Sequence, residues 1–235
     1  MAENRKLEAV LFDMDGVIVD SEPLWSETEK RLLARRNLAY SPSLKAAMMG
    51  RDAREAVSFL MEHYGLAESA GELIRERNQL IAELFQEHVE AIPGALELVS
   101  SVSAAGILTG LVSSSPKGLM ELALEKLGAT GLFALALSGD QVTRGKPSPD
   151  IYITAAEKLA VKPEHCLVIE DAPHGVTAAK SAGMRCLAIT TSVGVAVSHP
   201  DMENFQDIVE CSDQAVYQAK RLGKNRVIMF EQVAS

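Results

Sequence analysis

The chain has 235 residues, which is enough for one large domain or for a domain with a smaller insertion. Hydrophobic residues make up 47% of it, a normal proportion for a globular protein and too high for a disordered one. The formal net charge of −9 argues against a general nucleic-acid binder, which would present a basic face, but it leaves room for a locally positive site that takes an anionic substrate.

The cysteines and the first apolar run indicate the cellular compartment in which the protein is expected. Three cysteines make an odd, sparse set, which is not the framework of a disulfide-rich secreted protein. The first eight residues are polar and charged, and the apolar run that follows, Ala9 to Phe12, is too short for a signal peptide or a membrane span. We therefore expect a cytoplasmic protein with no nucleic-acid or membrane partner; we also expect a monomer.

Short apolar runs, each ending at polar residues, predict the buried strands of a parallel sheet. In chain order these runs are 9–12, 107–112, 135–137, 166–169 and 185–190. Between the later runs, apolar residues recur at helical spacing over 119–127, 151–160 and 175–182. This alternation predicts an α/β fold whose core is a Rossmann-like open parallel sheet with crossover helices.

Residues 21–89 have a different pattern, with no convincing strand. Three stretches there suit amphipathic helices, namely 24–38, 53–64 and 73–85. The simplest arrangement is a small helical cap domain, residues 21–89, inserted after the first strand into a catalytic core made of residues 1–20 and 90–235.

Two acids stand directly after the first predicted strand. Asp13 and Asp15 precede Gly16, which lets the chain turn sharply where the strand ends. In open α/β sheets, ligands bind outside the carboxyl ends of the strands, so these carboxylates belong to the expected site. One carboxylate can attack phosphorus while the other moves a proton. The alternative is that the acids cap the next helix, a role that does not need two of them.

Three further groups follow later strands or lie in a rigid loop. The serine cluster 113–115, which begins with Ser113 and Ser114, follows the second strand, where hydroxyls and backbone N–H groups suit a phosphate or an ordinary helix cap. Lys146 lies in a loop rich in proline and glycine, where it can shield an anionic nucleophile from an anionic substrate or can be a solvated surface lysine. Glu170 and Asp171 end another strand, which suits a hard cation such as Mg²⁺ or a helix cap.

In this order, the four groups resemble the motifs of the haloacid dehalogenase-like (HAD) superfamily. The residues around them, 15–22 and 170–175, also resemble the surroundings of those motifs, and the resemblance covers nearly the whole chain. It implies an α/β core with a small helical cap, a Mg²⁺ cofactor, and hydrolysis of a phosphomonoester through an aspartyl-phosphate.

The same resemblance implies a role for each residue. Asp13 would be the nucleophile, and Asp15 would be the general acid and then the general base. Ser113 and the backbone of Ser114 would bind the phosphoryl group, and Lys146 would bridge it to the nucleophile. The implied ligands of Mg²⁺ are acids, with Asp15 using its backbone carbonyl and Glu170 acting as a ligand or a support: Asp13, Asp15, Glu170 and Asp171.

Within the superfamily, the sequence resembles sugar-phosphate phosphatases and the β-phosphoglucomutase branch. The mutases carry a histidine ten residues after the acid/base aspartate, where this chain has Trp25. An indole cannot relay a proton as an imidazole can, so Trp25 favours hydrolysis over mutase-like phosphotransfer, which is the alternative. Arg51, in the expected cap, can contact the substrate or be an ordinary surface charge. We expect the substrate to be a sugar phosphate or a similar small phosphorylated metabolite.

The C-terminal stretch 212–227 resembles the closing helix and strand of diguanylate cyclase (GGDEF) domains. The signature loop of those enzymes is absent from the chain, so no cyclase activity is implied. A last helix followed by a short strand at 226–230 is the simpler expectation. A regulatory or binding module that has kept the phosphatase fold is a further alternative. The presence of every motif residue argues against it.

Overall fold

A computed structural model describes residues 6–41, 44, 47–48, 53–189, 194–195 and 228–229 of the chain. Its central feature is a sheet of parallel strands in the order β3-β2-β1-β4-β5. Their bounds are β1 Ala9–Phe12, β2 Leu108–Ser113, β3 Leu135–Ser138, β4 Cys166–Glu170 and β5 Arg185–Ala188. The predicted α/β fold with an open parallel sheet is confirmed, and the five predicted runs coincide with these strands apart from a residue or two at their ends.

β1 lies at the centre of the sheet, where the order of the strands reverses. The chain adds β2 and β3 on one side of β1, and then β4 and β5 on the other. The register places Phe12 level with Leu111 of β2 and with Ile169 of β4, so these three strands end at about the same height. Ligand sites in open α/β sheets lie beside such a switch point, at the carboxyl ends of the strands.

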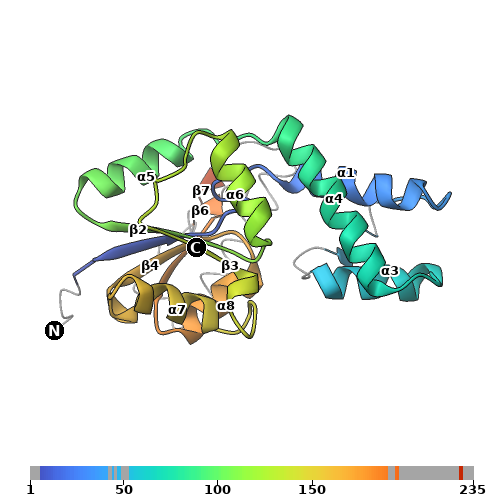
Figure 1. Ribbon diagram of the computed structural model, residues 1–235. Coiled ribbons are helices and arrows are strands. Elements are labelled where there is room, and N and C mark those ends of the chain that lie inside the picture. Colours follow the sequence, from blue (N-terminus) through green and yellow to red (C-terminus); the bar gives the residue numbers. More distant parts are fainter. Residues whose placement is uncertain are drawn as a thin grey trace, which may run out of the picture.

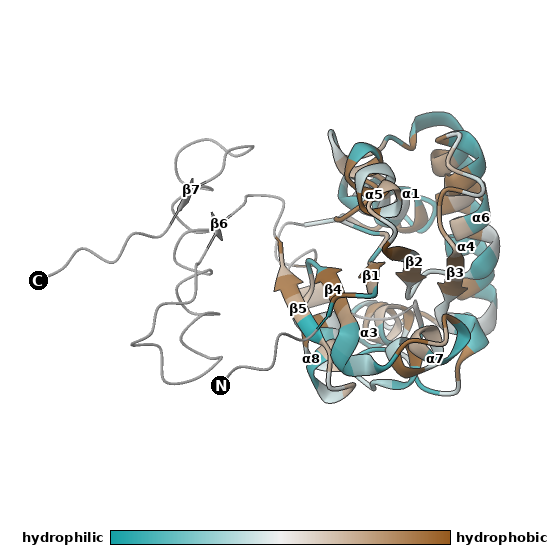
Figure 2. Cartoon of the chain, turned by 90° about the vertical axis from the view of Figure 1, so that its left-hand side faces the viewer, coloured by the Kyte–Doolittle hydropathy of each residue, from teal (hydrophilic) through white to brown (hydrophobic). Residues whose placement is uncertain are grey.

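Helices cover both faces of the sheet (Figure 1). One face is covered by α5 Ala95–Ala104 and α6 Lys117–Lys126, and the other by α7 Asp150–Lys158 and α8 Pro173–Ser181. Two short 3₁₀ helices, η1 Gly139–Gln141 and η2 Pro163–His165, lie in the connections. Figure 2 shows the central apolar strands between the two helical layers, which is why they form nearly continuous apolar runs in the sequence. The prediction of a buried strand is wrong for β5, which lies at the edge of the sheet and is largely exposed.

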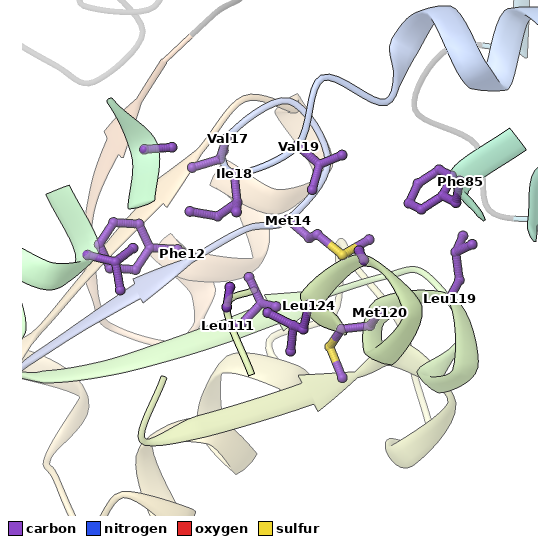
Figure 3. Close-up of a cluster of buried hydrophobic side chains, with 14 of the residues drawn as sticks. Phe12, Met14, Val17, Ile18, Val19, Phe85, Leu111, Leu119, Met120 and Leu124 are labelled. Carbon is purple, nitrogen blue, oxygen red and sulfur yellow. The ribbon is translucent and has the colours of Figure 1, made fainter. Parts of the chain in front are cut away.

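The residues of β1 alternate between two hydrophobic clusters, one on each face of the sheet. Val10 and Phe12 join the cluster under α5 and α6, whereas Ala9 and Leu11 pack with α7 and α8. Figure 3 shows that the loop after β1 continues into the first cluster, where Met14 lies near side chains of α6. Because the apolar residues of this loop are buried, the acids between them are carried on a fixed backbone rather than on a free surface loop.

Between β1 and α5 the described residues form helices and no strand. These are α1 Glu22–Ala34, α3 Ala53–Tyr64 and α4 Ala70–His88, which lie to one side of the sheet in Figure 1. The inserted helices share a hydrophobic cluster of their own, made of Leu32, Leu33, Leu44, Leu60 and Leu80. The second half of α4 instead joins the sheet's cluster through Ile81, Leu84 and Phe85. One inserted helix therefore packs on both parts.

The two segments that join the inserted helices to the sheet run side by side. Val19 pairs with Ala91 in an antiparallel bridge, and the Ile92 N–H donates to the Ile18 carbonyl at 2.8 Å. The proposed domain boundaries, at 20–21 and 89–90, fall at this pairing. The division into a core and a cap remains a prediction.

The end of α1 differs from the predicted helix over 24–38. The helix stops at Ala34, and Asn37 adopts a left-handed backbone with a φ of 55°. The Leu38 N–H then turns back to the Leu33 carbonyl at 3.0 Å, which satisfies an end group of the helix. Asparagine tolerates this conformation better than most residues, so it ends the helix before the apolar pattern does.

A second, two-stranded sheet pairs β6 Gly194–Val195 in parallel with β7 Ile228–Met229. β7 lies within the predicted strand at 226–230, whereas the stretch 212–227 and Arg51 lie outside the described residues. Within the described part of the chain, no helix combines the length and the apolar character that crossing a bilayer requires.

Candidate active site

The predicted site residues from three strands and one loop meet at the carboxyl ends of β1, β2 and β4. Asp13 follows β1, Ser113 ends β2, and Glu170 ends β4. Lys146 comes from the loop before α7 and reaches the same place, because it contacts acids from both β1 and β4. These residues are buried, although such polar side chains are usually exposed.

Lys146 is held between two carboxylates. Its Nζ donates to Asp13 Oδ1 at 2.5 Å and to Glu170 Oε1 at 2.6 Å, and also to the Val112 carbonyl at 3.3 Å. Burial by itself lowers the pKa of the Lys146 ammonium, but Asp13 and Glu170 outweigh it and raise that pKa well above its ordinary value. Lys146 is therefore a buried cation beside Asp13, and the alternative of a solvated loop lysine is wrong.

Glu170 has donors on both of its oxygens. Oε1 accepts from Lys146 and from the hydroxyl of Tyr152 at 3.0 Å, and Oε2 accepts from the backbone N–H groups of Asp171 and Ala172 at 2.9 Å each. The sequence analysis did not identify Tyr152, which lies on α7 and is fully buried, with its ring 5.0 Å from Lys146 Nζ. A tyrosine among the apolar residues of a predicted helix indicates a buried hydroxyl group, and such a group needs a hydrogen-bond partner inside the protein.

Asp15 joins the end of β2 to the inserted helices. Its Oδ1 accepts from Ser21 Oγ at 2.6 Å and from Trp25 Nε1 at 3.2 Å. Its Oδ2 accepts from Ser115 Oγ at 2.8 Å and from Ser113 Oγ at 3.3 Å. Ser21 was not predicted as a site residue, and Ser115 was predicted only as a member of the serine cluster 113–115. The alternative that Asp15 caps the next helix is wrong, because its carboxylate accepts hydrogen bonds from side chains and none from the backbone N–H groups in the first turn of α1.

Two glycines allow the loops to approach one another. Gly16 has a φ of 79°, and a Cβ at that position would overlap the carboxylate of Asp171. Gly175, near the start of α8, passes so close to the Glu170 carboxylate that a Cβ would overlap it as well. Asp171 therefore lies against the loop that follows β1, and only glycine fits at these two places.

The acids form a group that could hold a metal ion. Asp13, Glu170 and Asp171 each offer an oxygen, and these oxygens lie within 4.8 Å of one another. Burial and the neighbouring acids raise the pKa of Asp13 well above its usual value, against the pull of Lys146, and they raise the pKa of Asp171 to about 7. Since one lysine does not balance this many carboxylates, a hard divalent cation with oxygen ligands fits the site.

The remaining predicted residues divide into three cases. Ser114 has an exposed side chain, and its backbone lies in the loop that leads into α6. Trp25 is half-buried and reaches the site through Asp15. Arg51 lies outside the described residues, so the structure does not place it.

The family model of haloacid dehalogenase-like hydrolases matches residues 10–189, a stretch that includes every one of the buried site residues above. The chain belongs to the haloacid dehalogenase-like hydrolase family. A second model, that of the diguanylate cyclase GGDEF domain, matches residues 162–226, which overlaps the first match and extends the resemblance seen at 212–227.

Several relatives are phosphatases by name. The chain is 35% identical to validoxylamine A 7′-phosphate phosphatase of Streptomyces hygroscopicus over 79% of its own length and 86% of the relative's. It is 36% identical to the phosphorylated carbohydrates phosphatase of Thermotoga maritima, over 76% and 82%. A solved structure from Thermotoga maritima, assigned as a β-phosphoglucomutase, has a TM-score of 0.66 and 30% identity, with 95% and 94% covered. The prediction of a phosphoric monoester hydrolase of the HAD type is confirmed.

Proposed function

We propose that the chain is a Mg²⁺-dependent phosphatase that hydrolyses a small phosphomonoester through an aspartyl-phosphate on Asp13. The observation that carries this proposal is the buried contact of Asp13 with Lys146 at 2.5 Å, within a group of acids at the ends of β1 and β4. A fixed cation there offsets the repulsion that a phosphate group meets when it approaches a carboxylate nucleophile.

The proposed reaction has two steps. In the first, a carboxylate oxygen of Asp13 bonds to phosphorus, the bond between phosphorus and the ester oxygen breaks, and Asp15 gives a proton to the departing oxygen. In the second, water attacks the same phosphorus, Asp15 accepts a proton from that water, and the bond from Asp13 to phosphorus breaks. Inorganic phosphate leaves, and both acids return to their starting states.

The loop between β2 and α6 suits the phosphoryl group. Ser113 Oγ lies 3.3 Å from Asp15 Oδ2, and the backbone of Ser114 follows directly, shortly before the first turn of α6. Hydroxyls and free N–H groups at the start of a helix favour an anion. We assign the binding of the transferring phosphoryl group to Ser113 and to the Ser114 backbone, with Lys146 on the side of the nucleophile.

We assign the Mg²⁺ ion to Asp13, Asp171 and the backbone carbonyl of Asp15. When bound, the ion would neutralise negative charge on the phosphoryl oxygens. Glu170 belongs to the same acidic group, but its two oxygens already accept four hydrogen bonds. A carboxylate has about four acceptor positions, which favours Glu170 as a support for Lys146 over a direct ligand.

We propose that residues 21–89 form a cap domain that selects a sugar phosphate or a similar metabolite. The contact of Trp25 with Asp15 at 3.2 Å supports this assignment, since it brings α1 to the reacting groups. The relatives that act on phosphorylated carbohydrates support the substrate class. Arg51 remains a proposed substrate contact of the cap, alongside Trp25.

The test is phosphate release from a panel of phosphosugars and related phosphomonoesters, with Mg²⁺ and with a chelator. We expect turnover of some members with Mg²⁺, and none in the variant Asp13→Asn, which keeps the size of the side chain but removes the nucleophile. Asp150→Asn is the matched control, because this acid pairs with Arg144 at the surface. Full activity in Asp13→Asn would refute the mechanism.

The mutase alternative has a specific observation in its favour, the solved structure assigned as a β-phosphoglucomutase. Trp25 argues against it, because its N–H donates to Asp15 and an indole does not relay protons. The two are separated by supplying β-glucose 1-phosphate with a bisphosphate primer. Release of phosphate without isomerisation supports the phosphatase, and primer-dependent isomerisation supports the mutase.

A further inference from the structure

A chain of side-chain contacts runs from inside the inserted helices to Asp15. Trp25 of α1 donates from Nε1 to Asp15 Oδ1 at 3.2 Å. The guanidinium of Arg77, on α4, lies over the Trp25 ring at 4.4 Å from its centroid. Arg77 in turn donates from Nε to Glu29 Oε1, one turn further along α1, at 2.7 Å. Two contacts, one on each side of Trp25, therefore connect this buried ion pair with the proposed general acid and base.

The ion pair at the far end of this chain is unusual for its position. Glu29 and Arg77 are 4% and 8% exposed, so both charges have been taken out of water. Glu29 Oε2 is buried and accepts no hydrogen bond from the described residues. A buried ion pair often contributes little net stability, and an unsatisfied acceptor adds a further cost. Stability alone does not account for the pair, and its contact with Trp25 suggests another role.

The arrangement fixes the orientation of the indole. A planar guanidinium stacks on an aromatic face and holds the ring in one plane, and the Glu29 carboxylate fixes the guanidinium. With the ring held, the indole N–H points at Asp15 Oδ1, which also accepts from Ser21. Without the indole N–H, or without the cation that orients the indole, the Asp15 carboxylate would be fixed less firmly by the inserted helices.

We propose that Arg77 and Glu29 are positioning residues, which hold the Trp25 indole against Asp15 and so let the inserted helices orient the acid and base of the reaction. This inference rests on the proposed function in one respect, the role of Asp15. The reason for such a device is that proton transfer depends on the placement of the carboxylate at the leaving oxygen and at the attacking water.

The single tryptophan of the chain allows a direct test, because all indole fluorescence comes from Trp25. We expect Asp15→Asn, and separately Arg77→Lys, to change the emission spectrum. In the double variant the effect of Asp15→Asn should differ from its effect in the wild type, since the two groups act on one ring. Arg36→Met is the matched control. It removes another ion pair next to α1 and α4, with Glu76 at 2.6 Å, and should leave the emission unchanged.

Kinetics provide the second measurement. Trp25→Phe keeps an aromatic ring for the cation but replaces the indole with a phenyl group and so removes the N–H. We expect kcat to fall about tenfold with little change in KM, the size of one lost hydrogen bond to a charged group. Glu29→Gln with Arg77→Met removes both buried charges together, which avoids leaving one of them unpaired. In the Trp25→Phe background these two changes should lower kcat no further, because they act through the N–H.

The outcomes separate this inference from the proposed function. Emission that responds equally to Arg36→Met and Arg77→Lys, or losses of kcat that simply multiply in the combined variant, would overturn the positioning role. Inactivity of the wild type on every phosphomonoester tested would overturn the proposed function instead. The fluorescence coupling between Asp15 and Arg77 would still be measurable in that case, because it needs no turnover.

Discussion

At the scale of single residues, two of the acids in the site have both carboxylate oxygens occupied by donors. Asp15 accepts four hydrogen bonds from three serines and one indole, and Glu170 accepts four from a lysine, a tyrosine and two backbone groups. Such saturation fixes the direction of each carboxylate in a buried setting, where an unpaired oxygen would be costly.

The role of Tyr152 is testable at this scale. Tyr152→Phe removes the hydroxyl that donates to Glu170 Oε1 and keeps the ring next to Lys146. We expect the free energy of unfolding to fall by about 1–3 kcal/mol, because Glu170 is buried and would lose one of its donors. Denaturant unfolding measures this difference.

The control for this change is Tyr64→Phe. The Tyr64 hydroxyl donates to the Ala39 carbonyl at an exposed position, where water can replace it. Its loss should change the free energy of unfolding by less than about 0.5 kcal/mol. Equal effects of the two variants would contradict a supporting role of Tyr152 at Glu170.

At the scale of elements, α4 connects the inserted helices with the sheet. Leu80 of α4 packs in the cluster of the insertion, whereas Phe85, further along the helix, lies in the cluster of the sheet, beside α6 (Figure 3). The helix begins at Ala70, and the preceding Ser69 forms a capping box with Glu72 that fixes this start. A substitution of a buried residue in the second half of α4 should therefore lower the free energy of unfolding of the whole protein.

Phe85→Ala tests this connection. Phe85 is fully buried, and its removal should lower the free energy of unfolding by about 3–5 kcal/mol through lost transfer energy and the cavity left behind. The neighbouring change Gln86→Ala, on the exposed side of the same turn, should cost less than about 0.5 kcal/mol. Thermal unfolding, monitored by circular dichroism, compares the stability of the two variants. A Phe85→Ala protein as stable as Gln86→Ala would show that α4 does not bind the two parts together.

At the scale of the whole molecule, the sequence predicted what depends on strand order and missed what depends on packing. Lys146 lies in a loop, and its place in the order of the motifs shared with the haloacid dehalogenase-like superfamily is what indicated that it belongs to the site. The sheet and the positions of Asp13 and Asp171 could be predicted, because the carboxyl ends of parallel strands meet wherever they lie in the chain. The contact of Ser115 with Asp15 and the role of Arg77 could not. Ser115 contacts Asp15 across 100 positions of sequence, and Arg77 acts through a ring on another helix, so no local pattern indicates either role.

The balance of charge in the site leads to a prediction about the whole protein's stability. Four carboxylates face one lysine where the strands end: Asp13, Asp15, Glu170 and Asp171. A divalent ion that binds the folded protein and not the unfolded chain stabilises it by about 2.7 kcal/mol at a concentration 100 times its Kd. We therefore expect Mg²⁺ to raise the Tm of the wild type, measured by calorimetry, and a chelator to reverse the effect.

The variant Asp171→Asn assigns this effect to the site. It removes one proposed ligand and one of the repelling charges, so the protein without Mg²⁺ should be at least as stable as the wild type, while its gain in Tm on adding Mg²⁺ should largely disappear. Glu157→Gln makes the same change in net charge at an exposed position of α7, and it should keep the full gain. An Asp171→Asn protein that gains as much from Mg²⁺ as Glu157→Gln would place the ion elsewhere and remove Asp171 from its ligands.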